Sequence, residues 1–399
     1  MTEPITDVKQ NIVVLVVCQT FLLAISSTVV SVSSLVGQSL AGNKLLSSLP
    51  VTAFMLGAAV TTYPASLYMK RAGRRAGFRL GACSGLAGSF VAALAVSTAS
   101  FPLLCLGTLL LGSSNGIGQY YRFAAADASP AGFKSTAISL VMTGGLVGGL
   151  LGPSVSRFTV ELFSQRFLGA YLALAGYLML ALLILGRLKI AAPSGTAAQA
   201  PGRPLSEIVR QPEVLIAIVS AAMANGVMVL LMVATPLAMS FCHHPYAAAT
   251  SVIGWHFIGM FGPSLITGRL IHRFGTVRIM LVGTLVLFAS VAVALTGSSV
   301  SYFWVAMFLL GIGWNLIYIG GTTLLSESCH PDDKAKSQGL NDLAISVWQV
   351  VSSIFSGALV NSGGWHVLNY ISLLFTTLIV AGLLWLVWKR SAHAVTGEV

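Results

Sequence analysis

The chain has 399 residues, of which 56% are hydrophobic and 8% charged, and its formal net charge is +11. This low charged fraction excludes an ordinary soluble domain, in which about a quarter of the residues are charged. A basic excess is expected beside anionic membrane lipid and does not require nucleic acid as a partner. The composition therefore indicates a membrane protein with several spans.

Apolar runs of helix-spanning length divide the chain into twelve predicted transmembrane helices. They cover residues 11–36, 46–69, 79–98, 102–126, 135–157, 167–187, 213–239, 249–271, 279–296, 302–325, 339–361 and 367–388. The first run is too long for the apolar core of a signal peptide and is expected to be the first span. An even number of spans places both termini on the same side.

The distribution of basic residues assigns the sides of the membrane. With the N-terminus inside, most of the 22 Lys and Arg residues fall in cytoplasmic segments. The outer segments hold Lys44, Arg157 and Arg166, and Arg122 falls within the fourth span. By the positive-inside rule, both termini are expected to be cytoplasmic.

The two parts of the chain repeat each other at a distance of about 200 residues. Asn115 and Asn315 share this spacing, as do Asp127 and Glu327. We therefore predict an all-α membrane protein of two six-helix halves, residues 1–187 and 213–399, joined by a cytoplasmic linker at 188–212.

A similar loop follows the second and the eighth span. In each copy a small residue, Ser66 or Gly268, is followed four positions on by Lys70 or His272, and then by Arg and Gly. This frame resembles the G-x-x-x-D-R-x-G-R-R loop of the major facilitator superfamily, with Lys70 and His272 at the acidic position. The resemblance implies the twelve-helix major facilitator fold, transport by alternating access, and a gating role for Arg71, Gly73, Arg74, Arg75, Gly268, His272, Arg273 and Gly275.

The fifth span carries Ser139, Gly148, Gly152 and Pro153, which resemble the antiporter signature of drug exporters. The alternative is structural, because small residues allow close helix crossing and Pro bends a helix. A drug/proton antiporter is the second alternative function, but no acidic residue falls in mid-span. Arg122 is expected to form an ion pair with Asp127, with a substrate or gating contact as the alternative.

Soft metal ligands occur in the seventh and eighth spans. Met228 and Met232 are four residues apart, as are His256 and Met260, so each pair shares one helical face at a comparable depth. Thioethers with imidazole suit Cu(I). Packing of the apolar core is the alternative role for methionine. The outer turn between these spans could receive metal first or be a solvated turn, and it contains Cys242, His243 and His244.

These ligand pairs, together with the segments 234–239 and 255–264, resemble the CcoA-type copper importers, which are bacterial major facilitators. The resemblance implies copper import across the bacterial inner membrane for cytochrome oxidase assembly. The same wider family includes riboflavin importers, and riboflavin import is the first alternative. Its expected cavity lining would be polar and aromatic: Asn115, Gln119, Tyr120, Tyr121, Arg122, Trp255, Trp314, Asn315 and Trp348.

Other classes of function are not expected from the residues. No nucleophile–base set or phosphate-cradling loop occurs, so we predict no enzymatic activity and no permanent cofactor. The five cysteines show no CxxC spacing, and a disulfide framework is not expected. The predicted partners are a copper ion or small-molecule substrate and membrane lipid, and the predicted state is a monomer.

Overall fold

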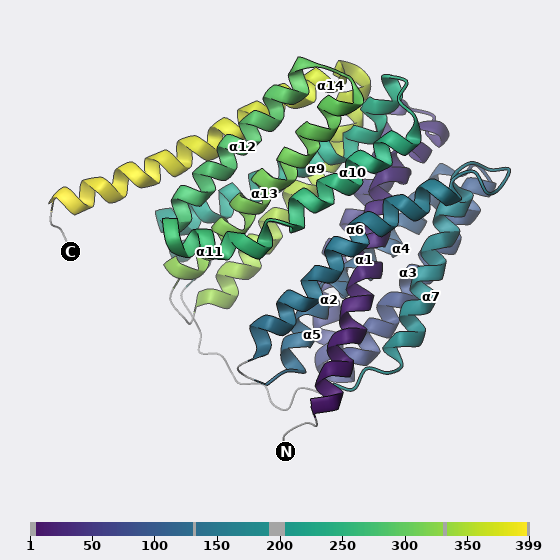
Figure 1. Ribbon diagram of the computed structural model, residues 1–399, viewed down its shortest axis with the longest axis horizontal. Helices are drawn as coiled ribbons and strands as arrows, with labels where there is room; N and C mark the ends of the chain where they lie inside the picture. Colours follow the sequence, from purple (N-terminus) through teal and green to yellow (C-terminus); the bar gives the residue numbers. More distant parts are fainter. Residues whose placement is uncertain (1–4, 131–132, 191–203, 330–332, 397–399) are drawn as a thin grey trace. The chain divides into compact units, whose positions relative to one another are not determined.

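A computed structural model describes residues 5–130, 133–190, 204–329 and 333–396 (Figure 1). Most of the predicted linker, residues 191–203, lies outside this range. All regular elements within it are helices, which confirms the all-α prediction. They are α1 (Ile5–Leu40), η1 (Lys44–Leu46), α2 (Leu49–Ala72), α3 (Arg74–Ser97), α4 (Phe101–Gly118), α5 (Tyr121–Asp127), α6 (Lys134–Thr159), α7 (Leu168–Leu185), α8 (Leu205–Val209), α9 (Pro212–Phe241), α10 (Tyr246–Phe261), α11 (Ser264–Phe274), α12 (Thr276–Thr296), α13 (Val300–Ser328) and α14 (Lys334–Thr396).

The helices have the length and composition of membrane spans. Within the described residues, 11 helical segments are long and apolar enough to cross a membrane. One of them, in α14, joins two helices at Gly364, where φ is 73° and ψ is −174°. The last two predicted spans, 339–361 and 367–388, lie on either side of this glycine. The protein is therefore a multi-pass membrane protein.

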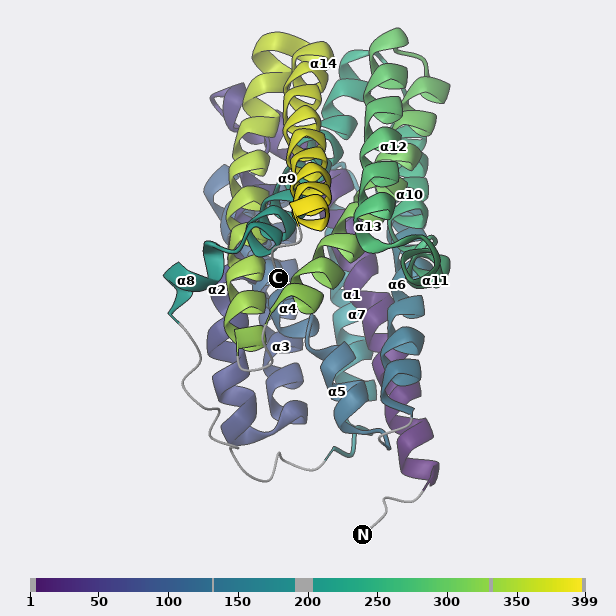
Figure 2. The ribbon, with the colours of Figure 1, turned by 90° about the vertical axis from the view of Figure 1, so that its left-hand side faces the viewer.

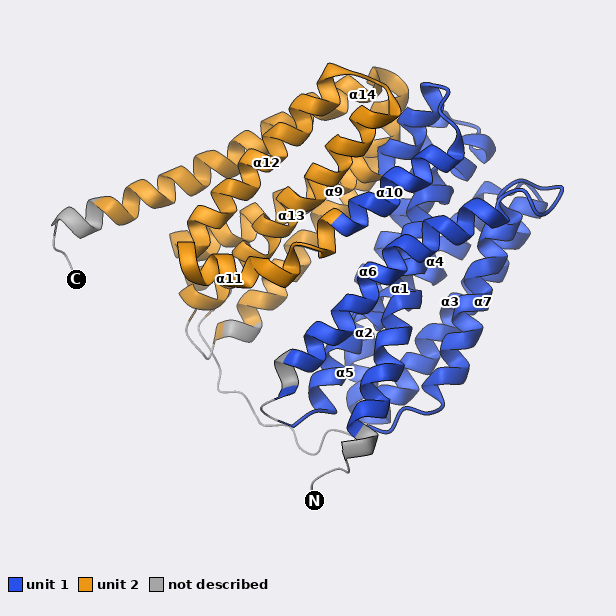
Figure 3. Cartoon of the chain, viewed as in Figure 1, with its two compact units in different colours: residues 1–195, 233–258 blue, residues 196–232, 259–399 orange. Residues whose placement is uncertain are grey.

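Two compact units account for the chain (Figure 3). The first contains residues 1–195 and 233–258, and the second contains residues 196–232 and 259–399. The C-terminal end of α9, from residue 233 on, and most of α10 thus group with the N-terminal helices. The division predicted at residues 188–212 stays a prediction.

In the first unit, α1 packs against α6, while α3 packs against both α4 and α7. The α1–α6 contact is close because glycines of α6 face backbone carbonyls of α1. A Cβ atom on Gly148 would lie 2.1 Å from the Thr20 carbonyl oxygen, and one on Gly152 would lie 2.2 Å from that of Ala24. Small residues at these positions therefore bring the two helices together, as the structural reading of this segment predicts.

In the second unit, α12 packs against α13 and α14 (Figures 1 and 2). Ile271, Ile279 and Leu316 form a small apolar cluster that joins α11, α12 and α13. A second cluster, of Ala221, Ala222 and Ile345, joins α9 to the first part of α14. This second cluster positions the polar and aromatic residues described below.

Candidate functional site

The repeated loop forms the same turn in both units. Gly73 joins α2 to α3 with φ of 85°, and Gly275 joins α11 to α12 with φ of 89°. Glycine adopts this region at little steric cost because it lacks a Cβ atom. The repeat seen in the sequence therefore corresponds to a repeated backbone conformation.

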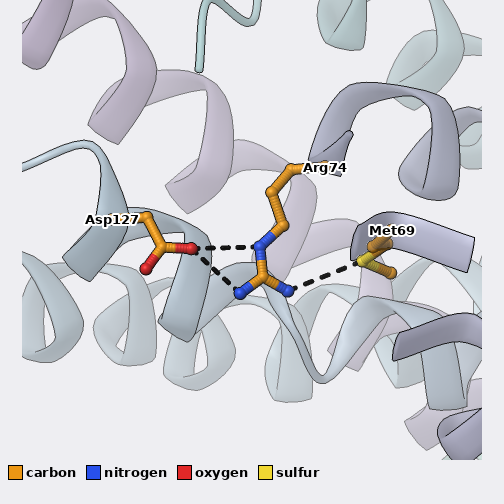
Figure 4. A network of polar contacts seen from close by, with 3 residues as sticks. All are labelled: Met69, Arg74 and Asp127. Carbon is orange, nitrogen blue, oxygen red and sulfur yellow. Dashed lines mark hydrogen bonds and ion pairs between the residues drawn. The ribbon is translucent and has the colours of Figure 1, made fainter. Parts of the chain in front are cut away.

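In each unit, the residue after this glycine contacts an acidic residue near the end of a helix. The Arg74 guanidinium donates from Nε at 3.0 Å and from Nη2 at 2.9 Å to Oδ2 of Asp127 (Figure 4). In the second unit, Oγ1 of Thr276 donates to Oε2 of Glu327 at 3.1 Å. The equivalence of Asp127 and Glu327 thus extends to their contacts, although the first is an ion pair and the second is not.

The predicted ion pair between Arg122 and Asp127 is wrong, because the Asp127 carboxylate is bound by Arg74. Arg122 and Asp127 are five residues apart in α5, which separates them by about 140° around the helix. The Arg122 guanidinium instead lies 4.9 Å from the centre of the Phe123 ring. Its Nε is buried and has no hydrogen-bond partner among the described residues.

The other predicted gating residues lie at the loop surfaces. Arg75 donates from Nη2 to the Gly186 carbonyl oxygen at 2.5 Å, which ties α3 to the end of α7. Arg273 lies over the Phe274 ring at 5.3 Å. The side chains of Arg71 and His272 are exposed, and Gly268 has open space around it. Their gating role stays a prediction.

The predicted lining residues of α4 and α5 are held by contacts inside the first unit. Asn115 donates to Ser26 Oγ of α1, and Gln119 donates to Asn115 Oδ1 at 3.2 Å. Tyr120 donates to the Thr62 carbonyl oxygen at 3.0 Å. Tyr121 is buried, with its ring 4.6 Å from that of Phe78. Of these residues, only Gln119 has an exposed side chain.

Two pockets of the first unit contain residues that were predicted to capture metal or to line the substrate cavity. One, of about 490 Å³, is lined by Arg166, His244 and Tyr246 among others. The other, of about 180 Å³, includes Trp255. On the turn between α9 and α10, Cys242 is half-buried and His243 is exposed. In the described part of the chain, no three His, Cys, Asp or Glu residues form a metal-binding group.

The four predicted metal ligands are all buried in α9 and α10. Met228, Met232 and Met260 belong to the second unit, whereas His256 belongs to the first. A metal site of all four residues would have to include side chains of both units, and each unit is described here by itself. The ligand role of these residues therefore stays a prediction.

Aromatic side chains gather in the second unit. The rings of Trp314 and Tyr318 are stacked, with centroids 4.8 Å apart and planes inclined by 10°. Tyr318 and Trp348 both pack against the cluster that joins α9 to α14. A Cβ atom on Gly226 would lie 3.5 Å from Cε3 of Trp348, so the indole lies beside α9 at this glycine. The half-buried Trp348 also meets Phe375 edge-on at 5.3 Å.

Two amide side chains connect α9 to α14 in the same unit. Asn225 donates from Nδ2 to the Ala221 carbonyl oxygen at 2.8 Å. Gln349 donates from Nε2 to Oδ1 of Asn225 at 3.2 Å. We call Asn225, Trp314, Tyr318, Trp348 and Gln349 the aromatic–amide cluster. The sequence prediction missed Asn225, Tyr318 and Gln349, although Asn225 and Gln349 are polar residues in otherwise apolar spans, which is a usable signal.

Asn315, a further predicted lining residue, forms hydrogen bonds between helices of the second unit. It donates to the Met260 carbonyl oxygen and to Ser264 Oγ, each at 2.6 Å, and accepts from Thr267 Oγ1 at 2.8 Å. These bonds use both N–H groups of its amide. Asn315 therefore connects α13 to α10 and α11 and has no N–H left for a substrate.

Comparison with known proteins gives full-length matches. The family model of the Major Facilitator Superfamily matches residues 15–262 and 243–397. The riboflavin transporter RfnT of Brucella anthropi is 36% identical over 392 residues, which is 98% of each chain. The uncharacterized MFS-type transporter YdeG of Bacillus subtilis is 28% identical, covering 94% of this chain and 92% of its own.

Solved structures share the fold at low identity. A bacterial homolog of the human lysosomal transporter Spinster matches 96% of this chain and 97% of its own with a TM-score of 0.71 at 14% identity. The xylose transporter XylE of E. coli matches 94% of this chain and 98% of its own with a TM-score of 0.70 at 12% identity.

These matches correct one prediction from the sequence. Copper import was the function expected from the four soft ligands, but the full-length relative at 36% identity is a riboflavin transporter. The copper prediction is therefore wrong, and the match favours the first alternative. The spacing of Met228, Met232, His256 and Met260 is equally compatible with core packing.

Proposed function

We propose that this chain, which belongs to the major facilitator superfamily, carries riboflavin across a membrane. The observation that carries the proposal is the 36% identity to a riboflavin transporter, which extends over 98% of both chains. Relatives of this kind are transporters and not enzymes.

The proposed direction is import into a bacterial cytoplasm across the inner membrane. The excess of Lys and Arg in the segments assigned to the cytoplasm supports twelve crossings with both termini inside. Two repeated units support alternating access, in which rocking of one half against the other exposes a central site to each side in turn.

The aromatic–amide cluster supports a flat, polar substrate. Small-molecule sites combine apolar and aromatic walls with a few polar groups that fix the orientation of the ligand. Trp348 offers an indole that is half-buried, and Gln349 offers an amide next to it in the sequence. Riboflavin, with its planar ring system and polar ring edge, fits this combination better than a metal ion does.

Uptake in two bacterial strains tests the proposed function. The first strain neither makes nor imports riboflavin, and the second lacks its high-affinity copper importer. Each strain expresses the chain and receives radioactive riboflavin or radioactive copper, with empty vector as the control. We expect accumulation of riboflavin well above the control, and no difference in copper. Accumulation of copper without riboflavin would overturn the proposal.

Substitution of Trp348 tests whether its indole belongs to the riboflavin site. Replacing Trp348 by Ala removes the proposed stacking surface, and aromatic pairs contribute about 0.5–1.5 kcal/mol. We therefore expect Trp348→Ala to raise the KM for riboflavin by about 2- to 10-fold, while Trp348→Phe retains most of the affinity. Trp388→Ala is the matched control, because Trp388 is 67% exposed near the end of α14. An unchanged KM in Trp348→Ala would remove Trp348 from the site.

A further inference from the structure

We infer that Gln349 recognises the imide edge of the flavin ring, with Asn225 as the positioning residue that sets the orientation of the Gln349 amide. This inference rests on the proposed function and names the specificity determinant of the same site. It depends on the fixed orientation of Asn225, the unused hydrogen-bonding groups of Gln349, and their match to one edge of the ring.

The first step is the orientation of Asn225. A backbone carbonyl can only accept hydrogen bonds, so the Asn225 atom 2.8 Å from the Ala221 oxygen must be the nitrogen Nδ2. The amide oxygen of Asn225 then points the other way, toward Gln349. Because Asn225 is 1% exposed, water does not compete for these bonds.

The second step is the orientation of Gln349. An oxygen of Asn225 faces it at 3.2 Å, so Gln349 must present its nitrogen Nε2 there. This bond uses one of two N–H groups. The second N–H group and the oxygen Oε1 make no hydrogen bond with any described residue. Gln349 is half-buried, and these groups are not among the fully buried unpaired atoms, so they are open to a ligand.

The third step is the chemistry of a ligand that pairs with both groups. A carboxamide with a free N–H beside a free oxygen binds a partner that offers an acceptor beside a donor. The pyrimidine edge of an isoalloxazine has this pattern, since its N3–H lies between two carbonyl oxygens. Two parallel hydrogen bonds form: Oε1 of Gln349 accepts from N3–H, and its second N–H donates to a ring carbonyl.

The tryptophan next to Gln349 in the sequence adds an aromatic surface to the proposed site. Trp348 and Gln349 are consecutive in α14, where Gln349 bonds to Asn225 of α9 and Trp348 lies beside the next residue, Gly226. One residue offers a ring surface, and the next offers a polar pair about 1.5 Å further along the helix axis and about 100° around it. The arrangement suits a ligand with an aromatic plane and a polar edge in that plane.

The experiment compares riboflavin with 3-methylriboflavin, which lacks the N3–H donor. Both compete with radioactive riboflavin for uptake, and binding to the purified, detergent-solubilised full chain is followed by quenching of flavin fluorescence. In the wild type we expect riboflavin to bind about tenfold more tightly, as the loss of one hydrogen bond predicts. In Gln349→Met, which keeps the length of the side chain without its polar groups, we expect the two ligands to bind within about twofold of each other.

Two further variants separate hydrogen bonding from shape. Asn225→Ala leaves Gln349 in place but frees its amide to rotate, so the preference for riboflavin is expected to fall. Val347→Ala is the matched control on the same helix, because Val347 is 52% exposed, and the preference is expected to remain at about tenfold. The fluorescence assay reports on binding even where a variant no longer transports.

The outcomes distinguish this inference from the proposed function. If the wild type neither binds nor accumulates riboflavin, the proposed function fails. If the wild type transports riboflavin but Gln349→Met retains the tenfold preference, the methyl group is excluded by shape alone, and the inference fails while the function stands. A wild type that binds both ligands equally would also overturn the inference.

Discussion

At the scale of single residues, the ion pair of Arg74 and Asp127 gives a test with an internal control. Asp127 is 45% exposed at its side chain, and Arg74 is 17% exposed, so the pair is a partly solvated one. We expect a coupling energy of about 0.5–1 kcal/mol in a double-mutant cycle of Arg74→Ala and Asp127→Ala. Unfolding of the purified protein in detergent measures it.

Arg122 supplies the control for this cycle, since it lies in the same helix as Asp127 but on a different face. The cycle of Arg122→Ala and Asp127→Ala should give no coupling beyond experimental error. Coupling of equal size for both arginines would mean that Asp127 senses the summed positive charge and not the contact of Figure 4.

These residues show what one sequence can predict about a site. Arg122, Asp127 and Asn315 were singled out from the sequence by their type, their position and, for Asp127 and Asn315, the repeat. Which neighbour each one contacts depends on the rotation of its helix, and the sequence does not supply that angle. The Asp127 partner was therefore missed, and the amide of Asn315, expected to line a cavity, is engaged inside its unit.

At the scale of helices, the contact of α1 with α6 predicts a large effect from a small substitution. A Cβ atom on Gly148 would lie 2.1 Å from a backbone oxygen of α1, which cannot rotate away as a side chain can. Gly148→Ala is therefore expected to force the helices apart and to lower stability by about 1–3 kcal/mol. Thermal unfolding in detergent measures the loss.

Gly145 is the matched control on the same helix. There the nearest atom to an added Cβ would be Cγ of Leu23 at 3.4 Å, which is an ordinary van der Waals contact. Gly145→Ala should leave the unfolding temperature nearly unchanged. If Gly145→Ala destabilised the protein as much as Gly148→Ala, the loss would not come from the close contact of α1 with α6.

The helices also show which boundaries hydropathy predicts well. The predicted span 213–239 agrees with α9 within a few residues, because a continuous apolar run has clear ends. The predicted span 249–271 was a single helix, whereas α10 ends at Phe261 and α11 begins at Ser264. Pro263 lies between them, and proline removes a helical hydrogen bond and clashes with the preceding turn. Hydropathy does not register such a break.

At the scale of the whole molecule, the family was accessible from the sequence, but the substrate was not. The repeated loop and the apolar runs reflect constraints of the fold, and they pointed to the family that the full-length matches identify. The methionines and His256 suggested copper because two residues four apart always share a helical face. Every apolar helix offers such pairs, so their spacing carries little information about the substrate.

The number of membrane crossings depends on whether α14 crosses the membrane once or twice. In a chain freed of its five native cysteines, Gly42→Cys and Ser391→Cys introduce single thiols at exposed positions near opposite ends of the chain. With twelve crossings, eleven of them separate these two sites, so a membrane-impermeant maleimide applied to intact cells should label Gly42→Cys and not Ser391→Cys. Permeabilised cells, in which both should react, provide the control.

If α14 crossed the membrane once, an even number of crossings would separate the two sites, and both would react from the same side. Labelling of both in intact cells would therefore contradict the two-helix structure that Gly364 gives to α14.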